Sequence, residues 1–173
     1  MNESALMIVL RLIHIFGGIF WAGSVALIGW FVMPAQAQLG QASPMFIREL
    51  MVRRRLPVFV MTSMGLSILS GLAMYTRLAM TTNGVWAAST TGKVLGFGAL
   101  SAIIGATIGG RAGAKMKGKM AAIGAKVQAG GGAPTEDQRL EIATNVASFQ
   151  KSLRVVTVFL IIAIAAMASA RYL

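Results

Sequence analysis

The chain has 173 residues, of which 56% are hydrophobic and 12% charged, and its mean hydropathy is +0.72. Soluble domains carry about 25% charged residues, so the composition predicts an integral membrane protein, and the absence of cysteine excludes disulfides and thiolate metal sites. The net charge of +11 gathers at the ends of apolar segments, which favours lipid headgroups as partners and not nucleic acid.

The first apolar run is long enough to cross a membrane. No charged residue lies between Leu12 and Met33, and these 22 residues would form about 33 Å of helix. We expect a span over about residues 5–33, capped within residues 2–4, ending before Pro34 and not removed as a signal peptide.

This run contains His14, the only histidine, and a titratable group inside a span is a functional-site candidate. The helical period places His14 in a stripe on one helix face, made of Arg11, His14, Gly18, Trp21 and Val25. Small residues flank the stripe and permit close helix contact, so we predict that this face meets another helix and not lipid.

The middle of the chain predicts four further elements. Residues 35–42 form a polar connection, about 44–55 a helix in the membrane interface, and about 57–76 the second span. Within that span, Ser63, Ser67 and Ser70 form a polar stripe that favours packing against another helix. Residues 78–92 are expected as a polar loop, with Asn83-Gly84 as its turn and Trp86 as an interfacial anchor.

The third and fourth spans are expected at about 93–111 and 153–171, joined by a helical hairpin over about 112–152. Glycines at four-residue spacing in the third span favour close contact with another helix. The glycines at 130–132 and Pro134 break the helix, and Thr135 with Gln138 predicts a capping box for a helix that continues into the fourth span.

Basic residues predict the topology of this all-α, single-domain chain of residues 1–173. Twelve lysines and arginines follow the first and third spans, whereas four lie on the other side. The positive-inside rule therefore places both termini outside an inner membrane and the hairpin in the cytoplasm, beside anionic lipids.

The four outer basic residues come from four different helices, and they are Arg11, Arg77, Lys93 and Arg171. Together with His14 they could hold an anionic group such as haem propionates or a lipid phosphate. The alternative is that those near the helix ends only extend toward the aqueous phase.

The segment LRLIHIFGGIFWAGS resembles the first span of copper-resistance CopD-like membrane domains and of HemJ-type protoporphyrinogen oxidases. The resemblance lies in Ile13-His14, where the families have a leucine before the histidine, and in Trp21 with Gly23. The basic run before the second span and the lysine that opens the third, Lys93, also resemble the HemJ type. The corresponding histidine and lysine of that type are tied to haem binding and activity, so the resemblance implies His14 and Lys93 as such a pair.

Two features depart from the HemJ type, namely the longer hairpin and Leu56-Pro57 in place of Asn-Pro. They leave oxidase activity open, and the long hairpin is similar to CopD-like relatives of unknown activity. One hypothesis is a haem b site with His14 as an axial ligand. Since the chain has one histidine, the other axial position would be Lys93, a methionine, open, or supplied by another subunit.

The alternative hypothesis is a cofactor-free accessory subunit of a larger membrane complex or a homo-oligomer. In it, His14 would hydrogen-bond a neighbouring helix, for example at one of the three serines of the second span. Copper handling is a lesser hypothesis that depends on Met61 and Met64, because methionine in an apolar helix usually fills the core.

Overall fold

The computed structural model describes residues 3–39 and 43–173, and each regular element in these ranges is helical. Four helical segments are long and apolar enough to cross a membrane, namely Glu3–Gln38, Leu56–Thr81, Thr90–Ala129 and Glu136–Tyr172. The predicted all-helical class and the four apolar helices are therefore confirmed. The part of the expected N-cap at residue 2, and residues 40–42 of the polar connection, lie outside the described residues.

The first helical segment continues past Pro34, so the prediction that it ends there is wrong. It consists of α1 (Glu3–Leu27), the π-helical turn η1 (Ile28–Val32) and α2 (Met33–Gln38). The wider π turn places Pro34 at the beginning of α2, where a proline is tolerated. The Met33 N–H bonds the Ile28 carbonyl, and Pro34 has no N–H. The Gly29 carbonyl therefore lacks the donors that a helix normally supplies.

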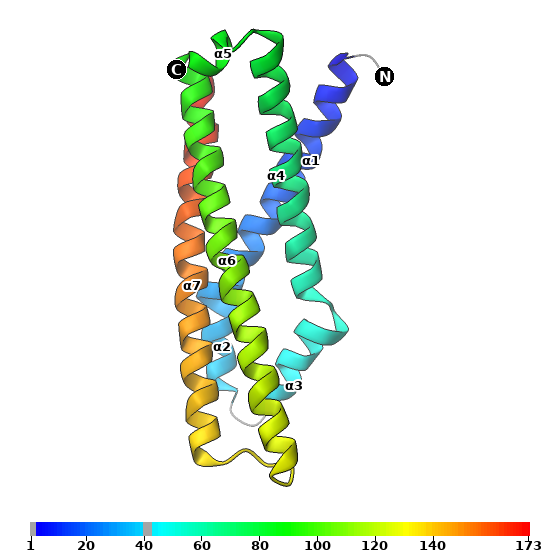
Figure 1. The fold of residues 1–173 in the computed structure, drawn as a ribbon, viewed down its shortest axis with the longest axis vertical. Helices are drawn as coiled ribbons and strands as arrows, with labels where there is room; N and C mark the ends of the chain where they lie inside the picture. Colours follow the sequence, from blue (N-terminus) through cyan, green and yellow to red (C-terminus); the bar gives the residue numbers. More distant parts are fainter. Residues whose placement is uncertain (1–2, 40–42) are drawn as a thin grey trace.

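A short helical element joins the first and second apolar segments. It consists of α3 (Ser43–Arg48) and the π turn η3 (Glu49–Arg53), close to the helix expected over 44–55. Arg55 has a φ of +50°, in the left-handed region, and the chain bends there before α4 (Leu56–Thr81) begins (Figure 1). α4 extends beyond the predicted end of the second span at residue 76.

The region expected as a polar loop over 78–92 is mostly helical, which corrects that prediction. No glycine or proline interrupts α4 between Gly71 and Asn83, so the helix continues to Thr81. The predicted turn is present at Asn83 and Gly84, with φ values of +48° and +82°, and α5 (Val85–Ala88) follows it. Trp86 is half-buried and meets the Tyr75 ring edge to face at 5.2 Å, so it packs on α4.

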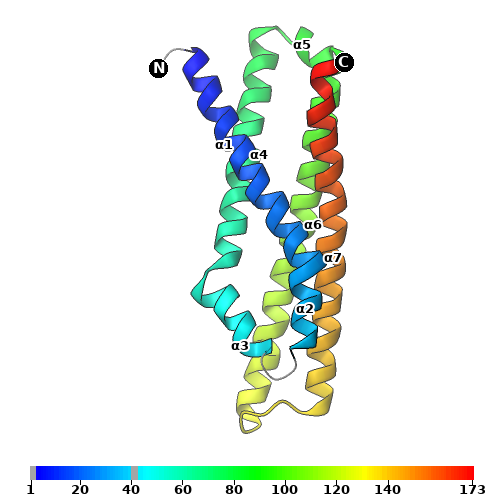
Figure 2. The same ribbon diagram turned by 180° about the vertical axis from the view of Figure 1, so that it is seen from behind.

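α6 (Thr90–Ala129) and α7 (Glu136–Ser169, followed by η4, Ala170–Tyr172) lie antiparallel and side by side (Figures 1 and 2). Both continue beyond their apolar parts, as the sequence predicted. The predicted capping box is also present, because Thr135 and Gln138 exchange side-chain to backbone hydrogen bonds of 3.3 and 2.9 Å.

The helices form two pairs, α1 with α4 and α6 with α7. Figure 1 shows both ends of the chain and the α4–α6 connection at the same end of the molecule. Toward its beginning, α1 diverges from α7, whereas η1 packs against α7 further along (Figure 2). A buried apolar cluster joins the pairs there, and it consists of Trp21, Val25, Ile28, Met33, Leu153, Val156 and Leu160.

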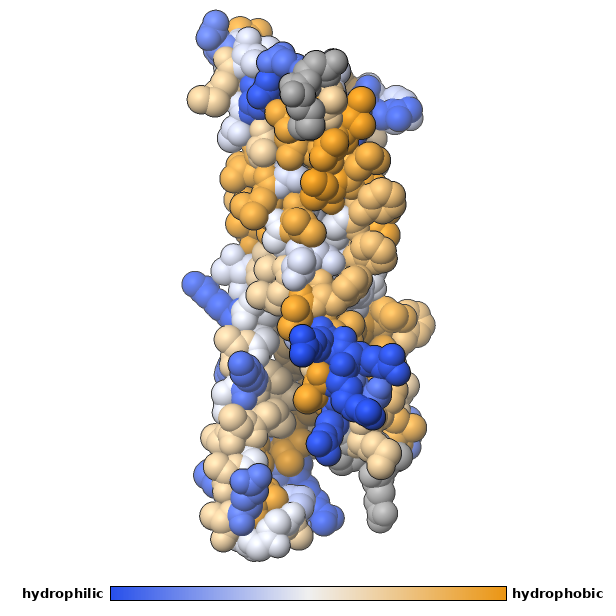
Figure 3. Space-filling model, turned by 90° about the vertical axis from the view of Figure 1, so that its right-hand side faces the viewer, coloured by the Kyte–Doolittle hydropathy of each residue, from blue (hydrophilic) through white to orange (hydrophobic). Residues whose placement is uncertain are grey.

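The surface divides along the long axis of the molecule. Figure 3 shows an apolar band over the upper part of one face, with strongly hydrophilic side chains below it. Exposed apolar side chains of α1 and α4 include Ile8, Phe16 and Leu69. An apolar exterior of this kind is expected where helices face lipid.

Candidate functional site

His14 lies on the face of α1 that packs against α4. Gly17, Trp21 and Val25 are buried on this face, and His14 is half-buried, as the predicted stripe requires. Arg11, one turn toward the beginning of the helix, is exposed. The stripe is therefore covered by neighbouring helices from His14 onward, whereas Arg11 at its beginning lies on the surface.

Two hydrogen bonds join His14 to Ser67. The His14 Nδ1 lies 2.7 Å from the Ser67 carbonyl oxygen, and the Ser67 hydroxyl donates to the His14 carbonyl at 3.2 Å. A carbonyl can only accept, so Nδ1 carries the hydrogen in the neutral ring and Nε2 keeps its lone pair. The sequence had pointed to the three serines as partners of the ring, but the partner atom is a backbone carbonyl.

Glycine makes room for this arrangement on both helices. A Cβ at Gly71 would lie 2.7 Å from His14 Cε1, so the imidazole occupies the space that a side chain there would fill. A Cβ at Gly17 would lie 2.9 Å from the Ser63 carbonyl oxygen, so the two backbones approach closely. Because α4 fills the space beside Gly17, this glycine does not leave a slot for a flat macrocycle.

The serine stripe of α4 is buried, as predicted, at Ser63, Ser67 and Ser70. The Ser70 hydroxyl donates to the carbonyls of Leu66 and Ser67, so the Ser67 carbonyl accepts from two side chains. Among residues 3–39 and 43–173, no group hydrogen-bonds His14 Nε2. The site therefore combines a fixed ring orientation with an uncommitted nitrogen lone pair.

The predicted basic residues have different contacts in the described part of the chain. Arg77 pairs with Glu3, which joins the end of α4 to the beginning of α1. Lys93 is exposed in the first turn of α6, in the other helix pair, and no hydrogen bond connects it to His14 in the described part of the chain. The Arg171 guanidinium lies 4.6 Å from the ring centroid of Tyr172. The sequence alone gives no register between the first and second apolar helices that would pair Glu3 with Arg77.

The two methionines considered for copper lie in different environments. Met61 is 53% exposed, whereas Met64 packs against the buried apolar cluster. The described residues contain no group of three or more His, Cys, Asp or Glu side chains that could hold a metal ion. Met64 therefore acts as core filler.

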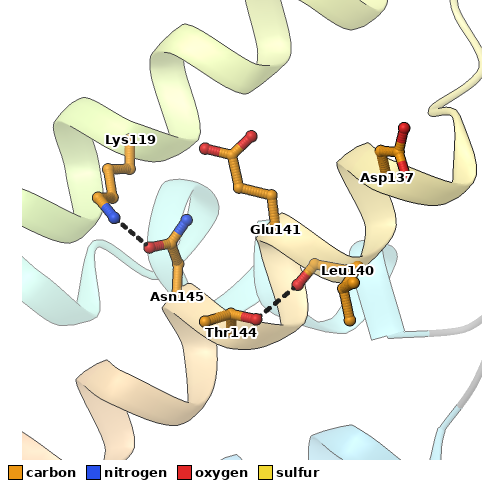
Figure 4. A pocket seen from close by; sticks show the side chains of 6 residues that line it. All are labelled: Lys119, Asp137, Leu140, Glu141, Thr144 and Asn145. Carbon is orange, nitrogen blue, oxygen red and sulfur yellow. Dashed lines mark hydrogen bonds between the residues drawn. The ribbon is translucent and has the colours of Figure 1, made fainter.

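A separate pocket lies between the far ends of α6 and α7 (Figure 4). Its volume is about 330 Å³, and its lining consists of Lys119, Asp137, Leu140, Glu141, Thr144 and Asn145. Lys119 donates to the Asn145 side-chain oxygen at 2.8 Å, but the buried Asn145 Nδ2 has no partner among the described residues. Sequence reasoning missed this buried amide, because Asn145 stands in a polar stretch that predicts a solvated helix.

Comparisons of the chain with protein-family models, with curated proteins and with solved structures found no match.

Proposed function

We propose that this chain is a four-helix membrane bundle, similar to CopD-like and HemJ-like proteins, that binds haem b through His14. The proposed topology has both termini outside the inner membrane and residues 112–152 as a cytoplasmic hairpin. Its support is the excess of basic residues after the first and third apolar helices, twelve against four. Anionic lipids, and other membrane subunits or a second copy, are the proposed partners.

The observation that carries the haem proposal is the state of the His14 ring. Histidines that bind a metal through one nitrogen commonly donate the other N–H to a backbone carbonyl or a carboxylate. His14 Nδ1 has such an acceptor in the Ser67 carbonyl at 2.7 Å, and Nε2 is left for iron. His14 would hold the haem iron through Nε2, and haem held there would supply one-electron redox or tetrapyrrole-related chemistry.

The basic residues would contribute unequally to a bound haem. Arg11 lies one helical turn from His14 and is exposed, so its charge suits a propionate that extends toward the aqueous end. Arg77 is a weaker partner for an anion because Glu3 already neutralises it. Lys93 lies in the other helix pair and is exposed, so it would be a weaker partner than Arg11 for a haem held by His14.

A cofactor-free accessory role is the second candidate. The reciprocal His14–Ser67 hydrogen bonds support it, because one satisfies the Nδ1 donor of the ring and the other joins the Ser67 hydroxyl to the His14 backbone carbonyl, so together they link α1 to α4. In that case the ring fixes the register of α1 on α4 and binds no ligand.

The visible spectrum of the purified protein, produced with ample haem, separates the two functions. Haem binding predicts a Soret band that His14→Ala removes. Gly71→Ala should shift or weaken the band while retaining the histidine, because the new Cβ would collide with the ring. Gly65→Ala is the matched control on α4, since a Cβ there meets nothing within 4 Å. A colourless, folded wild type would overturn the haem proposal and leave the accessory role, which co-purification with other subunits would test.

A further inference from the structure

The interruption of the first helix at η1 creates a binding point for α7. The Gly29 carbonyl, which lacks a helix donor, accepts from Gln150 Nε2 and from Arg154 Nε, each at 3.4 Å. Glycine favours this close approach, because a Cβ at position 29 would lie 3.1 Å from the Leu153 Cβ, tighter than most Cβ contacts. The close approach of α7 thus brings an arginine onto the carbonyl that lacks a helix donor.

Two contacts fix the Arg154 guanidinium. Its Nε bonds the Gly29 carbonyl, and its Cζ lies 4.8 Å from the ring centroid of Trp30. In the described part of the chain, neither Nη atom has a hydrogen-bond or ion-pair partner. The free Nη1–Nη2 edge is a planar fork that matches two oxygens of a phosphate or a carboxylate.

The surroundings of this fork are basic and uncompensated. The chain has five acidic residues, and none lies between Glu141 and the end of the sequence or between Glu49 and Glu136. Glu49 is already paired with Arg53 and Arg54. Arg111 adds a second charge near this level, because Gly109 of α6 contacts Val156 of α7. An anion is therefore the occupant that the charges favour.

The position along the helices indicates where this anion comes from. Arg154 directly precedes the charge-free run of residues 155–170, and Arg111 directly follows the charge-free run of residues 94–110. Both therefore mark the boundary of the apolar zone. Trp30 is 49% exposed at the same place, and half-exposed tryptophans are typical of the lipid headgroup level.

We infer that Arg154, oriented by the Gly29 carbonyl and the Trp30 ring, binds the phosphate of an anionic lipid headgroup through its Nη1–Nη2 edge. The inference shares membrane insertion with the proposed function but does not depend on haem at His14. The proposed lipid site has a defined geometry at Arg154, whereas the positive-inside distribution implies only a diffuse attraction to anionic lipids.

Native mass spectrometry of the detergent-solubilised full chain tests this site, with phosphatidylglycerol and phosphatidylcholine as probes. The wild type should retain phosphatidylglycerol in preference to phosphatidylcholine. Arg154→Gln should lower the phosphatidylglycerol affinity about tenfold, because it removes a charge-assisted pair of hydrogen bonds. Arg139→Gln is the matched control, since it removes the same charge from an exposed site in the hairpin.

A second variant and a competition experiment test the lipid site further. Arg154→Lys keeps the charge but loses the planar guanidinium edge, so it should also weaken phosphatidylglycerol binding. This variant replaces Arg154→Gln in the test if the glutamine variant does not fold. Equal losses in the Arg154 and Arg139 variants would reduce the effect to net charge and overturn the site. Displacement of the lipid by inorganic phosphate would assign the fork to a soluble phosphate and overturn the lipid proposal. An unchanged visible spectrum in Arg154→Gln would separate this result from any failure at His14.

Discussion

The two helix pairs both use glycine for close contact, but the nearest atoms differ at Gly17 and Gly105. A Cβ added at Gly17 of α1 would meet backbone atoms of α4, whereas one added at Gly105 of α6 would lie 3.3 Å from the Phe159 Cβ. The α1–α4 interface also holds the His14 ring by the hydrogen bond of Nδ1 to the Ser67 carbonyl, and the Ser67 hydroxyl donates to the His14 backbone carbonyl. The α6–α7 pair combines packing with hydrogen bonds from Ser101 to the Phe159 carbonyl and from Lys119 to Asn145, whereas the α1–α4 pair combines packing with an oriented imidazole that has one nitrogen unpaired in the described part of the chain.

Gly17→Ala should have the largest effect on stability of the substitutions that test this difference. The added methyl would lie 2.9–3.0 Å from backbone atoms of Ser63 and Ser67, which cannot move without shifting α4. We expect a loss of about 3 kcal/mol in the free energy of unfolding, measured by SDS titration in mixed micelles. Gly23→Ala on the same helix meets nothing within 4 Å and should be neutral or slightly stabilising. Equal stability of the two variants would refute the close backbone approach.

Gly105→Ala applies the same change to the α6–α7 pair. The atom nearest to the added methyl is the Phe159 Cβ, so Phe159 needs to shift by only a few tenths of an ångström. We expect a loss of about 1 kcal/mol in the same titration, clearly smaller than for Gly17→Ala. Gly110→Ala, with open space around it, is the control. A larger loss at Gly105 than at Gly17 would reverse the ranking of the two interfaces.

Asn145→Leu is expected to have an effect similar in size to that of Gly105→Ala but opposite in sign. Asn145 is 7% exposed and its Nδ2 is unpaired, so an apolar replacement removes a desolvation cost, and the exposed Lys119 returns to water. The unfolding free energy should rise by about 1 kcal/mol. Lys119→Met, which leaves the buried amide oxygen unpaired as well, should lower it. A destabilised leucine variant would instead indicate that the pocket holds an acceptor for Nδ2.

Much of the fold follows from patterns along the chain. Charge-free runs predict the four apolar helices because crossing a membrane requires about 20 apolar residues. The Ser63–Ser67–Ser70 stripe and the stripe through His14 predict buried faces because the helical period places each set on one side. The capping box at Thr135 predicts a helix start because its hydrogen bonds are local.

The sequence by itself thus determined the four apolar helices and their buried faces, since these depend on neighbours in the chain, but it did not determine that α4 continues to Thr81. Only the tertiary structure decided that the first helical segment continues past Pro34, because a π turn accommodates the proline and donors from α7 pair the carbonyl that it leaves without a partner. It also decided that a carbonyl, and not a serine hydroxyl, accepts from His14. Such pairings depend on the register between distant helices, and one-dimensional periodicity does not encode that register.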